Sequence, residues 1–314
     1  MREGTFAPRS LARERQDARL QPLYSPAVIR ELLERHGLRP NKALGQNFLA
    51  DRNILGRIVA ASEIAPGDVV LEIGAGLGSL TQALLEAGAR VIAIEKDNGL
   101  AKALAELFSS CDNAIIVHGD ALRLDWAELV NAHGPLLLQD TATALPRTIP
   151  CKVVANLPYY ITSPLLMHLL EGDLDWERAV VMVQREVAQR LVAAPGTKEY
   201  GALTVGVQYR ARIERLGPVP PTVFVPPPAV ASEIVRLKPK PELPVVGKSF
   251  PSLVKAAFGQ RRKTLRNALR QLSLAPAQIE EALTRAGISA ERRGETLSVE
   301  EFVILSKAID ELVV

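Results

Sequence analysis

The chain has 314 residues, of which 47% are hydrophobic and 23% charged, so it has enough apolar material for a large domain and a smaller one. Its formal net charge of +3 is too small to indicate a nucleic-acid partner by itself. No apolar run approaches the roughly 18–20 residues of a membrane helix, which argues against membrane-spanning classes. The two cysteines form no CxxC motif and the four histidines are scattered, so we expect a reduced, cytoplasmic protein without a structural metal.

Residues 1–23 are predicted to form a flexible leader. The stretch from Met1 to Arg19 is rich in arginine, is interrupted by acidic residues and contains no apolar segment. It therefore lacks the hydrophobic region that defines a secretory signal peptide.

Short apolar runs alternate with helical patterns through the first two thirds of the chain. Strands are predicted at residues 69–73, 90–95, 114–118, 153–156 and 179–183. Helices are predicted between them, starting near residues 81, 98 and 164. This alternation indicates an α/β fold with a doubly wound parallel sheet. Residues 232–237 alternate between apolar and polar and predict a late edge strand.

Two proline-rich regions interrupt this pattern. Residues 131–150 contain Gly134 and three prolines, and we expect a long loop or an insertion there. Residues 217–228 contain six prolines around Val223-Phe224-Val225, which predicts a stiff, extended loop. After Pro244 the pattern becomes entirely helical. We therefore predict one domain over residues 24–243 and a small helical domain over residues 244–314.

A cluster of cations stands out in the second of these domains. Between Phe258 and Arg270 there are five basic residues and no acidic one: Arg261, Arg262, Lys263, Arg266 and Arg270. We interpret this segment as a basic helix that contacts an anionic partner, with a plain solvated face as the alternative.

The first predicted strand runs into a glycine-rich turn, residues 72–81 with the sequence EIGAGLGSLT. Gly74, Gly76 and Gly78 would let the backbone approach a ligand at the start of the following helix, although tight packing alone could also require them. The spacing is GxGxG, so the third glycine of a GxGxxG dinucleotide fingerprint is replaced by Ser79. The turn also lacks the Lys-Ser/Thr pair of a P-loop.

Two carboxylates follow at the ends of the next two predicted strands. Glu95 could accept hydrogen bonds from both hydroxyls of a ribose, and its alternative is a solvated strand end. Asp120 could pair with the adenine amine of a nucleoside, although alone it is more typical of a turn. Because the carboxyl ends of parallel strands meet at one edge, these residues and the glycine turn together predict a nucleoside site.

The most informative stretch is Asn156-Leu157-Pro158-Tyr159, which follows a buried apolar run. An asparagine oxygen and a free backbone carbonyl can each accept a hydrogen bond from an aromatic amine, and Pro158 adds no competing N–H. Tyr159 offers a ring on which a base can stack. The stretch therefore predicts a site that holds an exocyclic amine, with an ordinary strand-to-turn exit as the alternative.

Six motifs appear in an order typical of one enzyme family: KALGQNFL from Lys42, LEIGAGLGSLT, IEKD, NLPYYITSP, FVPPPAVAS and FGQRRKTLRN from Phe258. In this combination the chain resembles the rRNA adenine N6,N6-dimethyltransferases, in particular those that act on the bacterial small-subunit rRNA. The resemblance covers about residues 27–312. It implies a Rossmann-like, S-adenosylmethionine-dependent methyltransferase sheet with a small C-terminal helical domain.

The resemblance also assigns expected roles to residues. The methyl-donor pocket would be lined by Asn47, Leu49, Gly74, Gly76, Gly78, Glu95, Asp120 and Asn156. Tyr159 would stack on the target adenine, and Phe224 would cover its other face, unless Phe224 is a core anchor. The implied reaction transfers four methyl groups to two adjacent adenosines in the 3′-terminal hairpin of 16S rRNA, within the immature 30S subunit. We expect a monomer that needs no metal and no membrane.

Four alternatives stay open from the sequence. A reductase with an aberrant fingerprint would also contain a glycine turn and an acidic residue. A large-subunit rRNA dimethyltransferase would share the chemistry, although the FGQRRKTLRN motif argues against it. A DNA adenine methyltransferase would act on duplex DNA. A ribosome-assembly checkpoint factor would bind immature subunits and have secondary catalysis. The leader and residues 131–150 depart from the family pattern without touching a site motif.

Overall fold

The computed structural model describes residues 21–41, 44–138 and 148–313. The chain divides into two compact units, Met1–Asn156 with Pro221–Ala229, and Leu157–Pro220 with Val230–Val314. The predicted leader over residues 1–23 lies almost entirely outside the described residues. Among the described residues no helix is long and apolar enough to cross a membrane.

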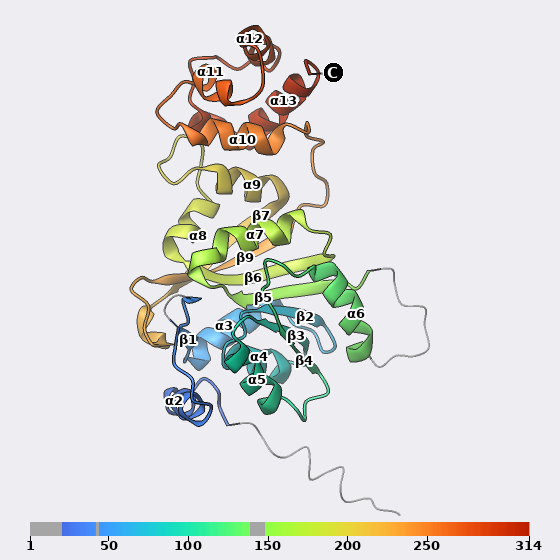
Figure 1. The fold of residues 1–314 in the computed structure, drawn as a ribbon, viewed down its shortest axis with the longest axis vertical. Coiled ribbons are helices and arrows are strands. Elements are labelled where there is room, and N and C mark those ends of the chain that lie inside the picture. The colour runs from blue at the N-terminus through green and yellow to red at the C-terminus, as the bar shows by residue number, and fades with distance from the viewer. Residues whose placement is uncertain (1–20, 42–43, 139–147, 314) are drawn as a thin grey trace, which may run out of the picture. The chain divides into compact units, whose positions relative to one another are not determined.

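The first unit is an α/β structure built on parallel strands (Figure 1). Its regular elements are α2 (Pro26–Arg35), β1 (Phe48–Leu49), α3 (Arg52–Ser62), β2 (Val69–Ile73), α4 (Ser79–Glu86), β3 (Arg90–Glu95), α5 (Asn98–Leu107), β4 (Ala114–His118), α6 (Trp126–Leu138), β5 (Cys151–Asn156), the 3-10 helix Pro221–Val223 and β8 (Phe224–Val225). Four of its strands lie in the order β4-β3-β2-β5 and all pairs are parallel. The strands predicted at 69–73, 90–95, 114–118 and 153–156 are confirmed.

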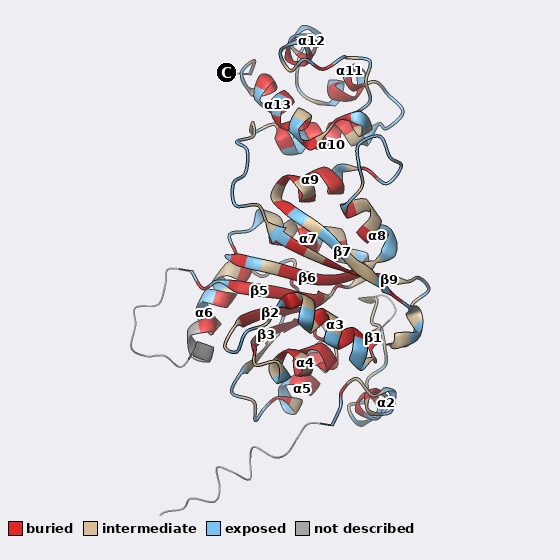
Figure 2. Ribbon diagram, turned by 180° about the vertical axis from the view of Figure 1, so that it is seen from behind, coloured by how far each residue is buried: buried red, intermediate tan, exposed pale blue. Residues whose placement is uncertain are grey.

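Three of the parallel strands, β2, β3 and β5, are largely buried, as Figure 2 shows for β2 and β5, whereas the outer strand β4 is only partly buried. Every residue of β2 and the first five residues of β5 are buried, which explains why these strands read as continuous apolar runs. The strand order reverses direction between β2 and β5, because β3 and β4 lie on one side of β2 and β5 on the other. A crevice forms at the carboxyl ends of strands at such a switch point, and ligands bind there in open α/β sheets.

The second unit contains the remaining elements: the 3-10 helix Tyr159–Ile161, α7 (Thr162–Glu171), β6 (Trp176–Gln184), α8 (Arg185–Leu191), α9 (Ala202–Arg210), β7 (Ala211–Val219), β9 (Ser232–Pro239), α10 (Phe250–Gly259), α11 (Leu265–Ala268), α12 (Pro276–Arg285) and α13 (Val299–Asp310), with short 3-10 helices at Leu269–Gln271 and Gly294–Thr296. Strand β9 lies between β6 and β7 and is antiparallel to both.

The predicted sheet needs two corrections in this unit. First, the strand at 232–237 is not an edge strand, because β7 flanks it and the first four residues of β9 are all buried. Second, the sheet is not parallel throughout, because β6, β9 and β7 run antiparallel. Strand β7 was missed because its sequence, ARIERLGPV, contains charges, a glycine and a proline. Those residue types fit an exposed outer strand that carries a bulge between Arg215 and Gly217.

The two regions predicted as loops contain regular structure. Helix α6 extends through Gly134 and Pro135 to Leu138, so the predicted loop at 131–150 is wrong for its first eight residues. Gly134 lets Ile149 pack closely on this helix, because a Cβ there would lie 2.6 Å from Ile149 Cδ1. Residues 139–147 lie outside the described residues. In the proline-rich region 217–228, a 3-10 helix and β8 replace part of the predicted extended loop.

The C-terminal helices share a hydrophobic core with α9. Tyr200 and Tyr209 are buried together with Phe250 and Phe302. The Tyr200 hydroxyl donates to the Leu297 carbonyl at 2.8 Å, and the Tyr209 hydroxyl donates to the Pro244 carbonyl at 2.7 Å. A separate domain that begins at residue 244 stays a prediction.

Candidate active site

The turn after β2 depends on glycine for two reasons. Gly74, Gly76 and Gly78 all have positive φ, at 72°, 61° and 84°, which other residues rarely adopt. The chain is also closely packed there. A Cβ on Gly76 would lie 3.2 Å from Phe48 Cδ1, and one on Gly78 would lie 2.7 Å from Phe108 Cε2. Tight packing, the alternative from the sequence, is therefore real, and it holds the turn in place at the carboxyl end of β2.

Glu95 ends β3 and its carboxylate is held by two backbone amides. Oε2 accepts a hydrogen bond from the Gly76 N–H at 2.9 Å, and Oε1 accepts one from the Asp97 N–H at 2.8 Å. The residue is 7% exposed, and this burial raises the pKa of its carboxyl above the usual range, against the lowering effect of the two backbone bonds. Each oxygen keeps a second lone-pair direction, so the carboxylate can still accept hydrogen bonds from a ligand.

Asp120 follows β4 and pairs with a lysine from the end of β3. Lys96 Nζ lies 2.9 Å from Asp120 Oδ2, and the Leu122 N–H donates to Asp120 Oδ1 at 3.1 Å. The hydrogen bond from Lys96 lowers the pKa of the Asp120 carboxyl, which therefore stays ionised and can accept hydrogen bonds. The Gly119 N–H donates to the Glu95 carbonyl at 2.9 Å and ties the two strand ends together.

Residues near the N-terminus reach the same edge of the sheet. Phe48 and Leu49 form β1, which pairs with Val225 and Phe224 of β8. Gln46 Nε2 donates to Oδ2 of Asp97, two residues after Glu95 in the chain, at 3.3 Å. Neither two-residue strand was predicted, because such short segments have no recognisable periodicity. The pairing brings Asn47 and Leu49 to the region of the glycine turn, since Phe48 contacts Gly76.

Asn156 ends β5, and its side chain has a defined orientation. Its Nδ2 donates to the Asn47 carbonyl at 3.3 Å. No donor within the described part of the chain bonds to its Oδ1, so the acceptor end of the amide is left for a ligand. The Asn47 amide is itself held by the Gly45 carbonyl at 3.0 Å. The sequence predicted that Asn156 accepts a hydrogen bond from an amine. The bond from its Nδ2 to the Asn47 carbonyl leaves Oδ1 as the atom that can do so.

Phe224 is 2% exposed, and Leu49, its partner across the β1–β8 pair, is 3% exposed. This burial fits the core-anchor alternative that the sequence left open. A role of Phe224 against the target base stays a prediction.

Leu157, Pro158 and Tyr159 begin the second unit. The Leu157 N–H donates to the Met182 carbonyl at 3.1 Å, whereas nothing in the described chain donates to the Leu157 carbonyl. The Pro158 carbonyl accepts from Thr162 Oγ1 at 3.1 Å and so is already engaged. Of the Leu157 and Pro158 carbonyls, the Leu157 carbonyl is therefore the one that remains available as a second acceptor among the described residues.

Glu72 is a buried acid that sequence reasoning did not single out. It is 1% exposed on β2, and Thr81 Oγ1 donates to its Oε2 at 2.6 Å. Burial raises the pKa of the Glu72 carboxyl to about 8, with Thr81 acting in the opposite direction and the Glu95 charge adding to the increase. An acidic residue within an otherwise apolar strand was the available signal.

Glu72 should make stability depend on pH. Its pKa rises from 4.5 to about 8 on folding, so between these values the folded state binds the additional proton. The free energy of unfolding then falls as pH rises from about 4.5 to 8, by at most about 1.4 kcal/mol per pH unit from this group. We expect Glu72→Gln to flatten this slope in urea unfolding at pH 5 to 8. An unchanged slope would contradict the assignment, and Glu86→Gln, at an exposed site, is the control.

The comparisons with known proteins identify the family. The sequence model described as "Ribosomal RNA adenine dimethylase" matches residues 37–311. The chain is 47% identical over 288 residues to "Ribosomal RNA small subunit methyltransferase A" of Pelotomaculum thermopropionicum, covering 90% of this chain and 95% of the relative. The protein of the same name from Moorella thermoacetica is 46% identical, with 91% and 98% covered. This chain belongs to the ribosomal RNA adenine dimethylase family.

Solved structures agree with the family. A dimethyladenosine transferase from Plasmodium falciparum matches with a TM-score of 0.66 and 26% identity over 85% of this chain and 98% of that one. The 23S rRNA methyltransferase ErmE matches with a TM-score of 0.57 and 30% identity over 84% and 100%. The resemblance drawn from the six motifs and the Rossmann-like methyltransferase fold are therefore confirmed, and the reductase alternative is excluded. Like its relatives, this dimethylase is a methyltransferase.

The basic segment of this dimethylase is not one continuous helix, contrary to the prediction, because residues 260–264 are not helical. Helix α10 ends at Gly259, residues 260–263 form a turn and a bend, and only Leu265–Ala268 form the short α11. The Leu265 and Arg266 N–H groups donate to the carbonyls of Arg292 and Ala290 at 2.6 Å and 3.2 Å. Leu265 and Leu269 are both buried in the C-terminal hydrophobic core.

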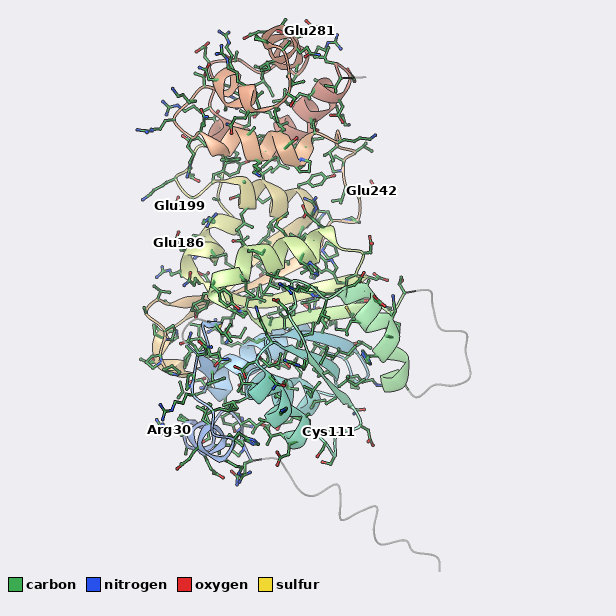
Figure 3. All side chains as sticks on the ribbon, in the orientation of Figure 1. Arg30, Cys111, Glu186, Glu199, Glu242 and Glu281 are labelled. Carbon is green, nitrogen blue, oxygen red and sulfur yellow. The ribbon has the colours of Figure 1, made fainter. Side chains whose placement is uncertain are left out.

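The five cations of this segment are not equivalent. Arg261 Nη2 donates to the carbonyls of Lys198 and Tyr200. These two residues flank Glu199, which Figure 3 labels in the loop before α9. Arg261 Nε also donates to Glu295 at 3.2 Å. Arg266 pairs with Glu280 at 2.5 Å. The three other cations are exposed and have no ion-pair partner in the described residues: Arg262, Lys263 and Arg270.

No group of three or more His, Cys, Asp or Glu residues able to hold a metal ion occurs among the residues described.

Proposed function

We propose that this chain transfers methyl groups from S-adenosylmethionine to N6 of two adjacent adenosines in the 3′-terminal hairpin of 16S rRNA, giving N6,N6-dimethyladenosines. The observation that carries this proposal is the orientation of the Asn156 amide, whose nitrogen is bound to the Asn47 carbonyl while its oxygen is left to accept from an amine. The relatives named for the small ribosomal subunit, at 40–47% identity over about nine tenths of the chain, support the choice of rRNA.

The residues present fit the methyl donor. Its nucleoside would take Glu95 at the ribose hydroxyls and Asp120 near the adenine amine, since both carboxylates lie at neighbouring strand ends tied by the Gly119–Glu95 bond. Gly74, Gly76, Gly78, Asn47 and Leu49 would complete the pocket. When bound, S-adenosylmethionine supplies a methyl group that its sulfonium charge has already activated for displacement.

The residues of the chain then act by positioning. Asn156 Oδ1 and the Leu157 carbonyl would accept from the two N6 hydrogens and hold the nitrogen lone pair towards the methyl group, which stabilises the charge that develops on nitrogen. After the first transfer, the methylated N6 has a single hydrogen, so only one of these two acceptors would hold it during the second transfer. The target base has to leave its stack to reach these acceptors, and Tyr159 would stack on the extruded base.

Incubation with radiolabelled S-adenosylmethionine and undermethylated small subunits, followed by nucleoside mass spectrometry, tests this function. We expect dimethyladenosine in the 3′-terminal fragment of 16S rRNA. Label in 23S rRNA or in duplex DNA would assign the chemistry to another substrate. Subunit binding without label would favour the assembly-checkpoint alternative, in which catalysis is secondary.

We further propose that the immature 30S subunit is the working substrate during late assembly and that the enzyme acts there as a cytoplasmic monomer. Phosphate contacts would come from the basic segment. Arg262, Lys263 and Arg270 support this role because they are exposed and have no ion-pair partner among the described residues, whereas Arg261 and Arg266 are engaged within the protein.

Reversing one free cation should weaken RNA binding. Each cation that neutralises a phosphate releases a counterion. A plot of log affinity against log salt concentration should therefore become less steep by about 1 in Arg262→Glu. The measurement is a filter-binding series on the 3′-terminal rRNA fragment at several salt concentrations. Lys307→Glu, at an exposed position of α13, makes the same charge change and should leave the slope nearly unchanged. Equal effects from both variants would refute a localised contact.

A further inference from the structure

Ser232 is a buried residue that makes one conspicuous side-chain contact. It is the first residue of β9, is 0% exposed, and its Oγ lies 2.5 Å from the Tyr159 hydroxyl, 73 residues earlier in the chain. Both residues belong to the second unit. Ser232 is the last residue of the FVPPPAVAS motif, and nothing in the proposed reaction has yet used it.

Both ends of this contact are fixed by backbone pairing. Ser232 is paired with Gln184 of β6 on one side and with Val219 of β7 on the other. The residue before it, Ala231, accepts from the Arg185 N–H at 3.0 Å. The Tyr159 end is anchored through Leu157, whose N–H donates to the Met182 carbonyl on the same strand β6. The hydroxyl contact therefore closes a bridge between two segments that both rest on β6.

A bond at the hydroxyl restricts a particular motion of the tyrosine. The Tyr159 hydroxyl oxygen lies on the axis about which the ring flips, so the hydrogen bond does not prevent flips. It fixes the position of the far end of the ring, and this restricts the side-chain torsion χ1. Tyr159 is only partly buried, so packing alone restrains its ring less than it would in a core. A ring that serves as a stacking platform loses its geometry if χ1 changes.

We propose that Ser232 is a positioning residue for methyl transfer: it holds Tyr159 in the rotamer in which the ring stacks on the target adenine. The proposal rests on the proposed function of Tyr159. It predicts that Ser232 acts through Tyr159 and through nothing else, so the two residues should be energetically coupled. Ser232 contacts the Tyr159 hydroxyl. The base would be touched by the Tyr159 ring and not by its hydroxyl.

A double-mutant cycle tests the coupling. We expect Ser232→Ala to lower kcat on small subunits about tenfold, because the Tyr159 hydroxyl is left without its partner and the ring is free to swing. Tyr159→Phe should lower kcat by a smaller factor, because it keeps the ring but loses the bond. The double variant should be no slower than Ser232→Ala, whereas independent effects would multiply. Ser232→Thr, which keeps a hydroxyl, should restore most of the activity.

Further readouts distinguish positioning from a general loss of structure. S-adenosylmethionine affinity should be unchanged, because the residues assigned to the donor lie in the first unit. The fraction of monomethyladenosine in the product should rise, since the second transfer has a single N–H to hold the base. Tyr160→Phe removes the neighbouring, exposed hydroxyl and should have wild-type kcat. Ser306→Ala removes another fully buried serine hydroxyl, which donates to the Val303 carbonyl, and should lower stability without changing kcat.

Several outcomes would overturn the proposal. Multiplying effects in the double variant, or wild-type kcat and product ratio in a folded Ser232→Ala, would show that Ser232 does not act through Tyr159. If Ser232→Ala does not fold, Tyr159→Phe with wild-type kcat has the same meaning. Absence of rRNA methylation by the unmodified enzyme would instead refute the proposed function, so the two failures are distinguishable.

Discussion

Replacing Asn156 by alanine should lower kcat for methyl transfer about 10²–10³-fold, the usual loss when one preorganised polar group at the reacting centre is removed. Asn156 Oδ1 has no donor in the described protein, so its acceptor capacity is reserved for the substrate amine. The loss should appear in kcat more than in the affinity for small subunits, because the bond strengthens as charge develops on the amine. The measurement is single-turnover methylation with nucleoside mass spectrometry.

The conservative change is equally informative. Asn156→Asp keeps the acceptor oxygen but replaces the Nδ2 donor with a second carboxylate oxygen, which would face the Asn47 carbonyl at about the 3.3 Å of the present hydrogen bond. We expect it to be nearly as slow as Asn156→Ala, since repulsion turns the side chain away from its working orientation. The control is Asn131→Ala in α6, which removes a side-chain acceptor for the Ile149 N–H. This variant should retain activity. Wild-type rates for Asn156→Asp would show that the Asn47 contact does not orient the amide.

Replacing Glu95 by glutamine should weaken S-adenosylmethionine binding about 30- to 100-fold, or roughly 2–3 kcal/mol. Two effects add. The ribose hydroxyls would lose a charged acceptor, and a charged acceptor makes the stronger hydrogen bonds. The amide NH2 would also face either the Gly76 or the Asp97 N–H, which now donate to the two carboxylate oxygens at 2.9 Å and 2.8 Å. One of these backbone donors would be left unsatisfied, so the turn itself is disturbed.

Isothermal titration with S-adenosylmethionine measures this effect directly and does not depend on any RNA. Glu86→Gln, at an exposed position at the end of α4, is the matched control and should bind the donor normally. Thermal melting of the free proteins separates loss of the ribose contact from loss of the fold. Unchanged affinity in a folded Glu95→Gln would exclude Glu95 from the donor pocket.

The site residues named from the sequence stay predictions, but the structure places several of them at strand ends, whereas the predicted sheet needed corrections. Gly74, Glu95, Asp120 and Asn156 were proposed because each lies at or just after the end of an apolar run, and the carboxyl ends of parallel strands lie at one edge whatever the order of the strands. That argument needs no knowledge of which strands are neighbours. The edge strand, by contrast, was assigned to 232–237 because that stretch alternates in polarity, and β7 was missed because its residues resemble a loop.

The same contrast holds for the basic segment. Its five cations were visible in the sequence, but a pattern of charges does not show which of them are neutralised by partners distant in the chain. Arg261 is engaged by carbonyls 61 and 63 residues away and by Glu295, and Arg266 is engaged by Glu280. The free cations, Arg262, Lys263 and Arg270, became distinguishable once these partners were placed.

The sequence by itself determined the α/β class, the methyltransferase family and the residues at the strand ends, because these follow from local patterns of burial and from ordered short motifs. Tertiary structure alone decided that β5 lies on the opposite side of β2 from β3, which places Asn156 and the glycine turn at the switch point. It also decided that the Asn156 amide bonds to the Asn47 carbonyl and that the Tyr159 hydroxyl bonds to Ser232. These contacts join residues 109 and 73 positions apart, and hydrogen bonds over such separations depend on how the strands pack, which periodicity in the chain does not encode.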